Sequence, residues 1–300
     1  MLLFEVKGLR LNGNWYCEDN GVYHTYFLEY PENAPLDGRH WSEQTVGHAV
    51  SSDLIHWEYK GTVLTADKNC WNDKGIATGS VVKFDGKWYM LYSGNSTKDA
   101  GGLGLAVSEN LQNWQRVGNA PVIDRNVLYD FELNGETIKV KMLADPYIYP
   151  ETFDGYFYAY INAVVDGCDI NDSAVQAIMK SKDLINWEPH KIACRDACNR
   201  IETSQIWPHG DKWYMYGGAV TYPNGIDYSN QISKNIIYVS DKCDEGFKRL
   251  CEIDMDENFY IAKMVYDKQG REVVLANDIP RGIIGPYRIE YGKNEIKFVK

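Results

Sequence analysis

The sequence predicts an all-β chain that folds as a single five-bladed β-propeller over residues 1–300, with four antiparallel strands per blade. Two interleaved repeats carry this prediction. The first is a hairpin of aromatic strands, which recurs roughly every 55 to 70 residues, a period typical of repeat architectures. The second is a Ser-Asp-Leu-like turn that ends in Trp. No sustained helical periodicity favours a different fold class.

The hairpin repeat is recognised by a short turn rich in Asp, Asn and Gly between two β-rich segments. Such a turn is the strongest short-range signal for a β-hairpin. In the first copy, residues 15–18 and 22–30 are the expected strands and residues 19–21 the turn. The later copies are residues 85–92, 154–160, 210–216 and, more weakly, 267–275.

The second repeat supplies the outer half of each blade. Copies occupy residues 52–57, 108–114 and 181–187, with a degenerate copy at 240–247. A short β-like segment precedes each copy, so each unit holds four strands. We interpret Trp57, Trp114 and Trp187 as structural residues that fill the space between blades. Residues 285–300 and the N-terminal segment are expected to close the ring.

Composition limits the possible partners. The chain is 44% hydrophobic, which suffices for a core, and its net charge is -11. Nucleic acids and anionic membranes prefer basic surfaces, so neither is an expected partner, and a small oligosaccharide or glycoside fits better. The seven cysteines show no metal-binding spacing, which predicts reduced, mostly buried thiols, no metal and no cofactor. Without an apolar stretch that could serve for export or membrane insertion, a cytoplasmic protein is expected.

Two carboxylates stand out where the inner strands approach the central channel. Asp145 lies nine residues before Asp154, and Glu202 lies nine residues before Asp211, which predicts equivalent places in two blades. In glycosidic cleavage, one carboxyl group protonates the leaving oxygen while another positions the sugar or activates water. The alternative is that each carboxylate only caps a strand, and the shared spacing argues against it.

An ordered set of motifs resembles the five-bladed propeller glycosidases, the clan of glycoside hydrolase families 32, 43, 62 and 68. GVYHTYFLEYP resembles the family 32 strand GEYHLFYQYNP, and Trp41 with GHAVSSDLIHWE resembles WGNMHWGHAVSKDLVHWE. Three shorter matches follow in the same order. They are Thr78-Gly79-Ser80 to the SGS segment, Asp145-Pro146 to RDP, and Glu202-Thr203 to EC.

The resemblance implies a glycoside hydrolase that acts on a furanoside or pentose-like sugar at a chain end. It implies that Glu202 is the general acid and that Asp145 orients the sugar and tunes the pKa of the acid. The expected substrate-binding residues are Asn12, Trp41, Asp73 and Thr78.

The third carboxylate of the resembled site, the Asp of NDPNG, falls on Asn12. A neutral amide is neither a nucleophile nor a base, so hydrolysis would need another base, such as Asp73, or assistance from the substrate. A shifted alignment of WMNDPNG with residues 15–21 would instead bring Glu18 or Asp19 near this position. We favour the alignment that places Asn12 at the central channel, beside Asp145 and Glu202.

Two further differences from the family 32 pattern bear on the expected substrate. The Arg of RDP is replaced by Ala144, and no C-terminal β-sandwich typical of family 32 is expected within the 300 residues. Both points argue against fructan or sucrose and favour family 43. Two other functions stay open: a carbohydrate-binding pseudoenzyme, and a phosphorylase similar to glycoside hydrolase family 130. The phosphorylase would need cations for phosphate, and Arg39, His40 and Arg281 are weak candidates.

Overall fold

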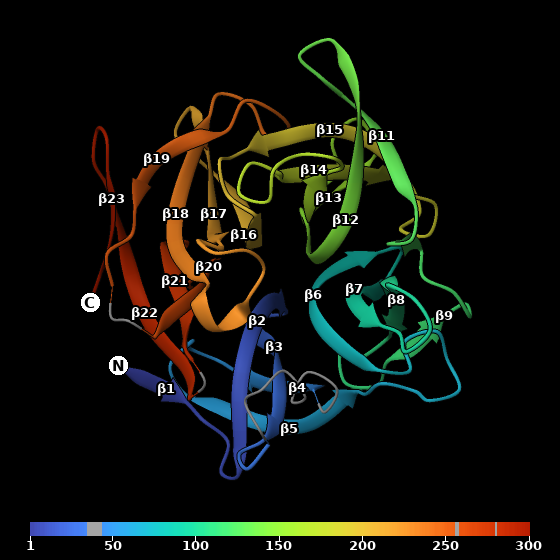
Figure 1. The fold of residues 1–300 in the computed structure, drawn as a ribbon. Coiled ribbons are helices and arrows are strands. Elements are labelled where there is room, and N and C mark those ends of the chain that lie inside the picture. Colours follow the sequence, from blue (N-terminus) through green and yellow to red (C-terminus); the bar gives the residue numbers. More distant parts are fainter. Residues whose placement is uncertain (35–43, 256–257, 280) are drawn as a thin grey trace.

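The computed structural model describes residues 1–34, 44–255, 258–279 and 281–300. They form five antiparallel sheets arranged as a ring around a central channel (Figure 1). Each sheet is one blade, which confirms the predicted five-bladed propeller.

The blades follow one another in chain order, and the first long strand of each lies at the channel (Figure 1). Blade one contains β2 (Leu9–Asp19), β3 (Val22–Pro31), β4 (Thr45–Ser51) and β5 (Trp57–Leu64). Blade two contains β6 (Gly75–Phe84), β7 (Lys87–Asn95), β8 (Gly102–Ser108), β9 (Gln115–Val117) and β10 (Ile123–Asp124). Blade three contains β11 (Leu128–Leu133), β12 (Glu136–Ile148), β13 (Phe157–Val165), β14 (Ala174–Ser181) and β15 (Glu188–Arg195). Blade four contains β16 (Arg200–His209), β17 (Lys212–Thr221), β18 (Ile232–Ser240) and β19 (Lys248–Glu252). Blade five contains β20 (Phe259–Tyr266), β21 (Glu272–Asp278), β22 (Gly282–Tyr291), β23 (Ile296–Val299) and, from the N-terminus, β1 (Leu2–Phe4).

The ring is closed by strands from both ends of the chain. β1 pairs antiparallel with β22, with Leu2 opposite Ile284, and β23 also pairs with β22. The expected closure by residues 285–300 and the N-terminal segment is therefore confirmed.

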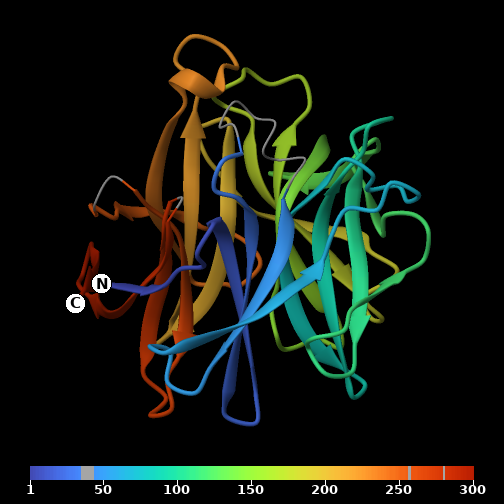
Figure 2. The same cartoon turned by 90° about the horizontal axis from the view of Figure 1, so that it is seen from below.

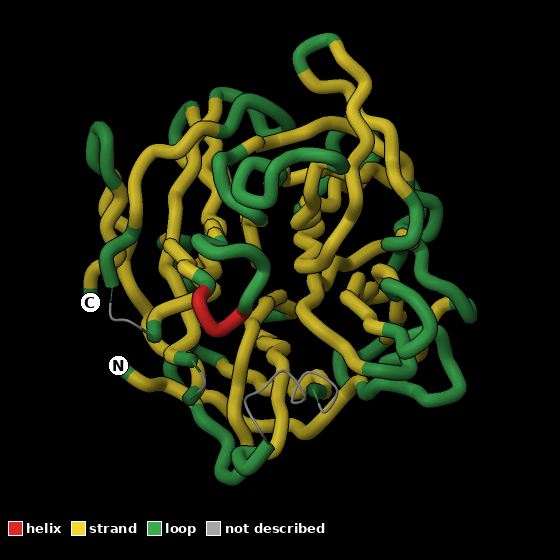
Figure 3. The backbone as a smooth tube through the Cα atoms, viewed as in Figure 1, coloured by secondary structure: helices red, strands yellow, loops and turns green. Residues whose placement is uncertain are grey.

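The hairpin turns lie where the repeat predicts them. Asn20, Asp85 and Asp154 adopt positive φ angles of 53°, 48° and 51°, and each is followed by a glycine at positive φ. This pair of conformations suits the two-residue turns that match the twist of a hairpin. Figure 2 shows the β2–β3 turn at one end of the ring and the short 3-10 helix η2 (Tyr228–Asn230) at the other. Figure 3 shows η2 in red within the loop between β17 and β18.

The Ser-Asp-Leu turns are held by their own side chains. Ser51 Oγ accepts hydrogen bonds from the amides of Asp53 and Leu54, at 3.1 and 2.9 Å. The Asp53 carboxylate accepts from the amides of Ile55 and His56, at 2.9 and 2.8 Å. Such side-chain-to-backbone bonds stabilise the turn locally, which explains why Ser and Asp recur at these positions.

The hydrophobic core is divided into five clusters, one between each pair of adjacent blades. Trp57, Trp114 and Trp187 each pack, partly buried, on the cluster between their own blade and the preceding one. The indole of Trp187 also donates a hydrogen bond to the carbonyl of Leu184 at 2.8 Å. Their interpretation as structural residues is confirmed.

All seven cysteines are free thiols. Only Cys194 and Cys198 are buried, so the expectation of mostly buried thiols is wrong for the other five. Over the described ranges, no group of three or more His, Cys, Asp and Glu side chains could hold a metal ion. No helix in these ranges is both long and apolar enough to cross a membrane.

Candidate active site in the central channel

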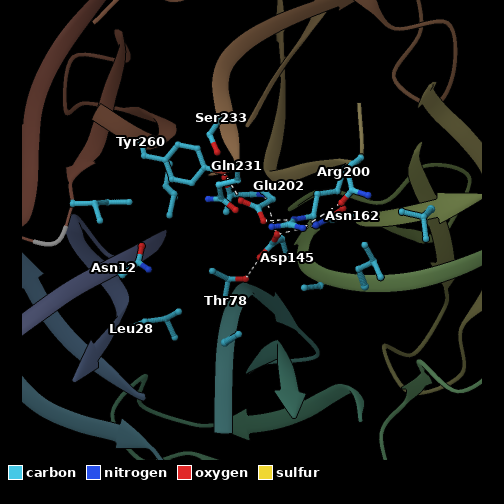
Figure 4. A pocket seen from close by; sticks show the side chains of 18 of the residues that line it. Asn12, Leu28, Thr78, Asp145, Asn162, Arg200, Glu202, Gln231, Ser233 and Tyr260 are labelled. Carbon is cyan, nitrogen blue, oxygen red and sulfur yellow. Dashed lines mark hydrogen bonds and ion pairs between the residues drawn. The ribbon is translucent and has the colours of Figure 1, made fainter. Parts of the chain in front are cut away.

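A cavity of about 950 Å³ occupies the channel at the end that carries η2, whose loop contributes Ile226 and Gln231 to its lining. Most of the other lining residues come from the inner strands of all five blades. The cavity brings together four of the residues predicted from the sequence, among the side chains drawn in Figure 4: Asn12, Thr78, Asp145 and Glu202.

A β-bulge interrupts the inner strand of every blade beside the cavity. A bulge inserts extra residues, bends the strand and changes where its side chains point. In four blades a residue of the bulge has a positive φ angle, between 53° and 62°. These residues are Gly13, Asp145, Thr203 and Ile261.

The bulges correct the predicted equivalence of the two carboxylates. Asp145 corresponds to Thr203, the positive-φ residue, whereas Glu202 precedes the bulge and corresponds to Ala144. The offset arises because β12 and β13 are joined by a longer loop, residues 149–156, than the two-residue turn between β16 and β17. Counting back from the turns therefore gives places that differ by one residue.

Asp145 is held by donors from three blades. Thr78 donates from its hydroxyl to Oδ1, and Asn162 Nδ2 donates to Oδ2 at 3.2 Å. The amide of Thr203 also donates to Oδ2 at 3.2 Å. The carboxylate is thus fixed in orientation, and the Thr203 amide ties it to the bulge next to Glu202.

Both oxygens of Glu202 are engaged as well. Arg200 Nε lies 2.5 Å from Oε1, and Tyr260 Oη donates to Oε2 at 2.5 Å. Burial, reinforced by the charge of Glu202, raises the pKa of Tyr260 well above its ordinary value, so the phenol stays a donor. The tyrosine can approach this closely because the residue opposite Glu202 on β17 is Gly218, where a Cβ would lie 2.4 Å from Tyr260 Oη.

Lys263 supports the same bulge from blade five. Its side chain is buried, and Nζ donates to the carbonyls of Thr203 and Ser204 at 2.5 and 3.3 Å. Burial lowers the pKa of Lys263 to about 7, although the nearby charge of Asp145 acts in the opposite direction. The lysine therefore joins blade five to the backbone between the two carboxylates.

Asn12 faces these groups from the other side of the cavity (Figure 4). Its Oδ1 is buried and has no hydrogen-bond partner among the described residues. Glu18 and Asp19 lie beside the turn at the far end of the same hairpin, where Asp19 forms an ion pair with Lys83 at 2.9 Å. The shifted alignment, which would bring an acid into the cavity in place of Asn12, is therefore wrong.

Several other expected residues lie elsewhere. Asp73 is not among the residues that line the cavity, and its carboxylate accepts hydrogen bonds from the amide and hydroxyl of Thr97, at 2.7 and 2.5 Å. Arg281 points toward Glu5, at 3.6 Å. Trp41, Arg39 and His40 lie outside the described residues.

Sequence reasoning missed four residues of the site: Arg125, Lys141, Arg200 and Tyr260. Tyr260 stands before the bulge of β20 as Glu202 does before that of β16. An alignment of the inner strands across all five repeats could have found it.

Comparison with known proteins agrees with this fold. The sequence profile of the glycosyl hydrolases family 32 N-terminal domain matches residues 10–277. A raffinose invertase of Escherichia coli is 22% identical over 275 residues, 86% of this chain and 52% of the relative. The vacuolar acid beta-fructofuranosidase 4 of Arabidopsis thaliana is 25% identical over 296 residues, 93% of this chain and 39% of the relative. The chain thus spans about half, or less, of the length of these relatives.

Among solved structures, a GH32 beta-fructofuranosidase from Bombyx mori has the same fold. The two superpose with a TM-score of 0.71 at 19% identity, over 96% of this chain and 61% of that one. The preference for family 43, which rested on Ala144 and on the expectation that the 300 residues hold no C-terminal β-sandwich, is corrected by the match to the family 32 profile. Because that profile covers most of the chain, the protein belongs to glycosyl hydrolases family 32.

Proposed function

We propose that the protein hydrolyses the glycosidic bond of a terminal furanoside of the β-fructofuranoside type, with Glu202 as general acid and Asp145 as the residue that orients the sugar. The convergence of the two carboxylates in one cavity carries this proposal. The names of the relatives, an invertase and beta-fructofuranosidases, support the sugar class.

The contacts of the site fit these roles. Glu202 protonates the leaving oxygen, and Arg200 and Tyr260 hold its carboxyl group in place, because a proton donor must be positioned before it can act. Asp145, fixed by its three donors, accepts hydrogen bonds from sugar hydroxyls.

Unpaired polar atoms around the carboxylates also suit a sugar. Asn12 Oδ1, Asn162 Oδ1 and Thr203 Oγ1 are buried and lack a partner among the described residues. A buried acceptor without a donor costs free energy, and the hydroxyls of a sugar would supply donors. The cavity around the two carboxylates is therefore suited to hold a polyhydroxylated ligand.

Asn12 supports a second candidate function, carbohydrate binding without turnover. An amide cannot carry the charge that stabilises an oxocarbenium-like transition state or act as nucleophile. Neither Asp73, Glu18 nor Asp19 lines the cavity to replace it.

One screen separates these functions. Sucrose, an aryl β-fructofuranoside and an aryl arabinofuranoside are incubated with the protein, and sugar release and calorimetric binding are both measured. Release of sugar from either fructofuranoside supports hydrolysis, and release from sucrose should be lost in Glu202→Gln. Binding without release supports the pseudoenzyme, whereas strict dependence on added phosphate would identify a phosphorylase.

A further inference from the structure

Blade five buries a cation at a position where the other four blades carry an uncharged residue. Lys263 is the residue at which the pairing of β20 with β21 resumes after the bulge. The corresponding residues of the other inner strands are Asn14, Gly79, Tyr147 and Gln205. The propeller fold therefore does not itself require a charge at this position.

The charge of Lys263 has no carboxylate partner. The residue is only 8% exposed and forms no ion pair with any residue described. Its Nζ donates instead to the carbonyls of Thr203 and Ser204. Burial of a cation without an opposite charge costs free energy, because two carbonyl dipoles replace only part of its hydration. A buried charge that is kept at such a cost is a candidate for a role in function.

Thr203 of blade four connects this cation to Asp145. Its carbonyl accepts from Lys263, while its amide donates to Oδ2 of Asp145 at 3.2 Å. Its φ angle of 53° is unfavourable for threonine, so the bulge depends on partners that hold it in place. The next residue, Ser204, is fixed as well, because its hydroxyl donates to Gln176 Oε1 at 2.8 Å.

A carboxylate that is held in one orientation binds a sugar hydroxyl without first having to be ordered. We propose that Lys263 is a positioning residue of the site: its buried ammonium group fixes the Thr203 bulge, and the amide of Thr203 in turn orients Asp145 toward the sugar. Lys263 itself is not among the residues that line the cavity. The proposal rests on the proposed function only for the role of Asp145 in sugar binding.

Calorimetric binding of fructose at pH 6, below the pKa of the amine, tests this role. Lys263→Met removes the charge and the donors, and should raise the Kd roughly tenfold, the size of one hydrogen bond to a charged group. Lys263→Arg keeps both and should restore the Kd to within about twofold. Lys139→Met is the matched control and should leave the Kd unchanged, because Lys139 pairs with Asp130 at 2.6 Å and does not line the cavity.

A double-mutant cycle shows whether Lys263 acts through Asp145. Asp145→Ala alone should weaken the binding of fructose. Addition of Lys263→Met should then weaken it by no more than about twofold, because the side chain that Lys263 positions is already absent. Losses that multiply in the double variant would overturn the proposal, since Lys263 would then contribute independently of Asp145.

Crystal structures of the variants give a readout that needs no sugar. In Lys263→Met the distance from the Thr203 amide to Asp145 Oδ2 should exceed about 3.5 Å, the limit of a hydrogen bond, and an unchanged distance would overturn the proposal. If Lys263→Met does not fold, Lys263→Gln takes its place. It keeps a donor for one carbonyl, so it should lengthen the same distance and raise the Kd roughly threefold. If no sugar binds but the distance depends on Lys263, the proposed function fails while the positioning role stands.

Discussion

Blades one and four carry different side chains at the same position, the residue just before the β-bulge of the inner strand. In both, the residue before the bulge of the inner strand lines the cavity, and that residue is Asn12 in blade one and Glu202 in blade four. Glu202 has partners on both oxygens, whereas Asn12 Oδ1 has none among the described residues. The backbone therefore fixes where a functional group stands, while its chemistry depends on a single side chain and the neighbours that engage it.

The largest effect is expected at Glu202. Glu202→Gln removes the proton donor but keeps the shape of the side chain, so turnover of substrates with poor leaving groups should fall by roughly 10²- to 10⁴-fold. Activated aryl glycosides, whose leaving groups need little protonation, should lose less. Steady-state kinetics with both substrate types provide the measurement, and wild-type rates on both would rule out Glu202 as the acid.

The corresponding test in blade one replaces the amide of Asn12 by a carboxylate. Asn12→Asp supplies a charge where the transition state develops a positive one, and should raise turnover by roughly 10²- to 10³-fold. The gain should disappear in the double variant with Glu202→Gln. Asn12→Ala, which removes only a hydrogen-bonding group, should weaken sugar binding by about 1 kcal/mol. An unchanged rate in Asn12→Asp would mean that the place of Asn12 is not the missing carboxylate position.

The role of Lys263, which supports the bulge of blade four from blade five, can be tested by varying the pH. The pKa of Lys263 is lowered to about 7 in the fold from 10.5, so between these pH values the unfolded chain binds one more proton than the folded one. Stability should therefore rise with pH, by about 1.4 kcal/mol per unit above pH 7. Urea unfolding at pH 7, 8 and 9 measures this slope. Lys263→Met should flatten it, and an identical slope in the variant would contradict the assignment.

The smallest catalytic effect is expected at Tyr260. Tyr260→Phe keeps the ring that packs over Gly218 but removes the hydrogen bond to Glu202, so kcat should fall about tenfold, the size of one charge-assisted hydrogen bond. KM should change little if the tyrosine acts through Glu202 rather than on the substrate. A large rise in KM with kcat preserved would instead place Tyr260 in sugar binding.

Much of the fold could be predicted because its signals are local. The turns at Asn20 and Asp85, and the Ser51–Asp53 contact, are made by residues close in sequence, so each repeat displays them. The position of Asn12 in the cavity followed from the hairpin register for the same reason. Trp57 could be interpreted as structural because it belongs to the same local repeat.

The rest of the site depends on contacts between blades, which sequence spacing does not reveal. Tyr260 of blade five meets Glu202 of blade four from 58 residues away, and Arg125 of blade two donates to the carbonyl of Leu143 in blade three. The offset between Asp145 and Glu202 arose from a longer loop in blade three, which preserved the spacing in sequence but not the equivalence in space. Asp73 was expected in the cavity because it is acidic and lies upstream of a hairpin, yet a local partner, Thr97, engages it.

The pairing of β1 with β22 has a consequence for how the chain reaches its fold. Leu2 and Phe4 pair with Ile284 and Ile283, so this contact closes the longest loop among the strand pairings of the described residues. Contacts at long sequence separation bear the entropy of loop closure before they contribute stability, and they form slowly. During synthesis, β1 must wait until blade five has been made. β1, which precedes the other described strands in the chain, is thus among the last of them to find its partner, and until then residues 283–284 of β22 have no partner on that side.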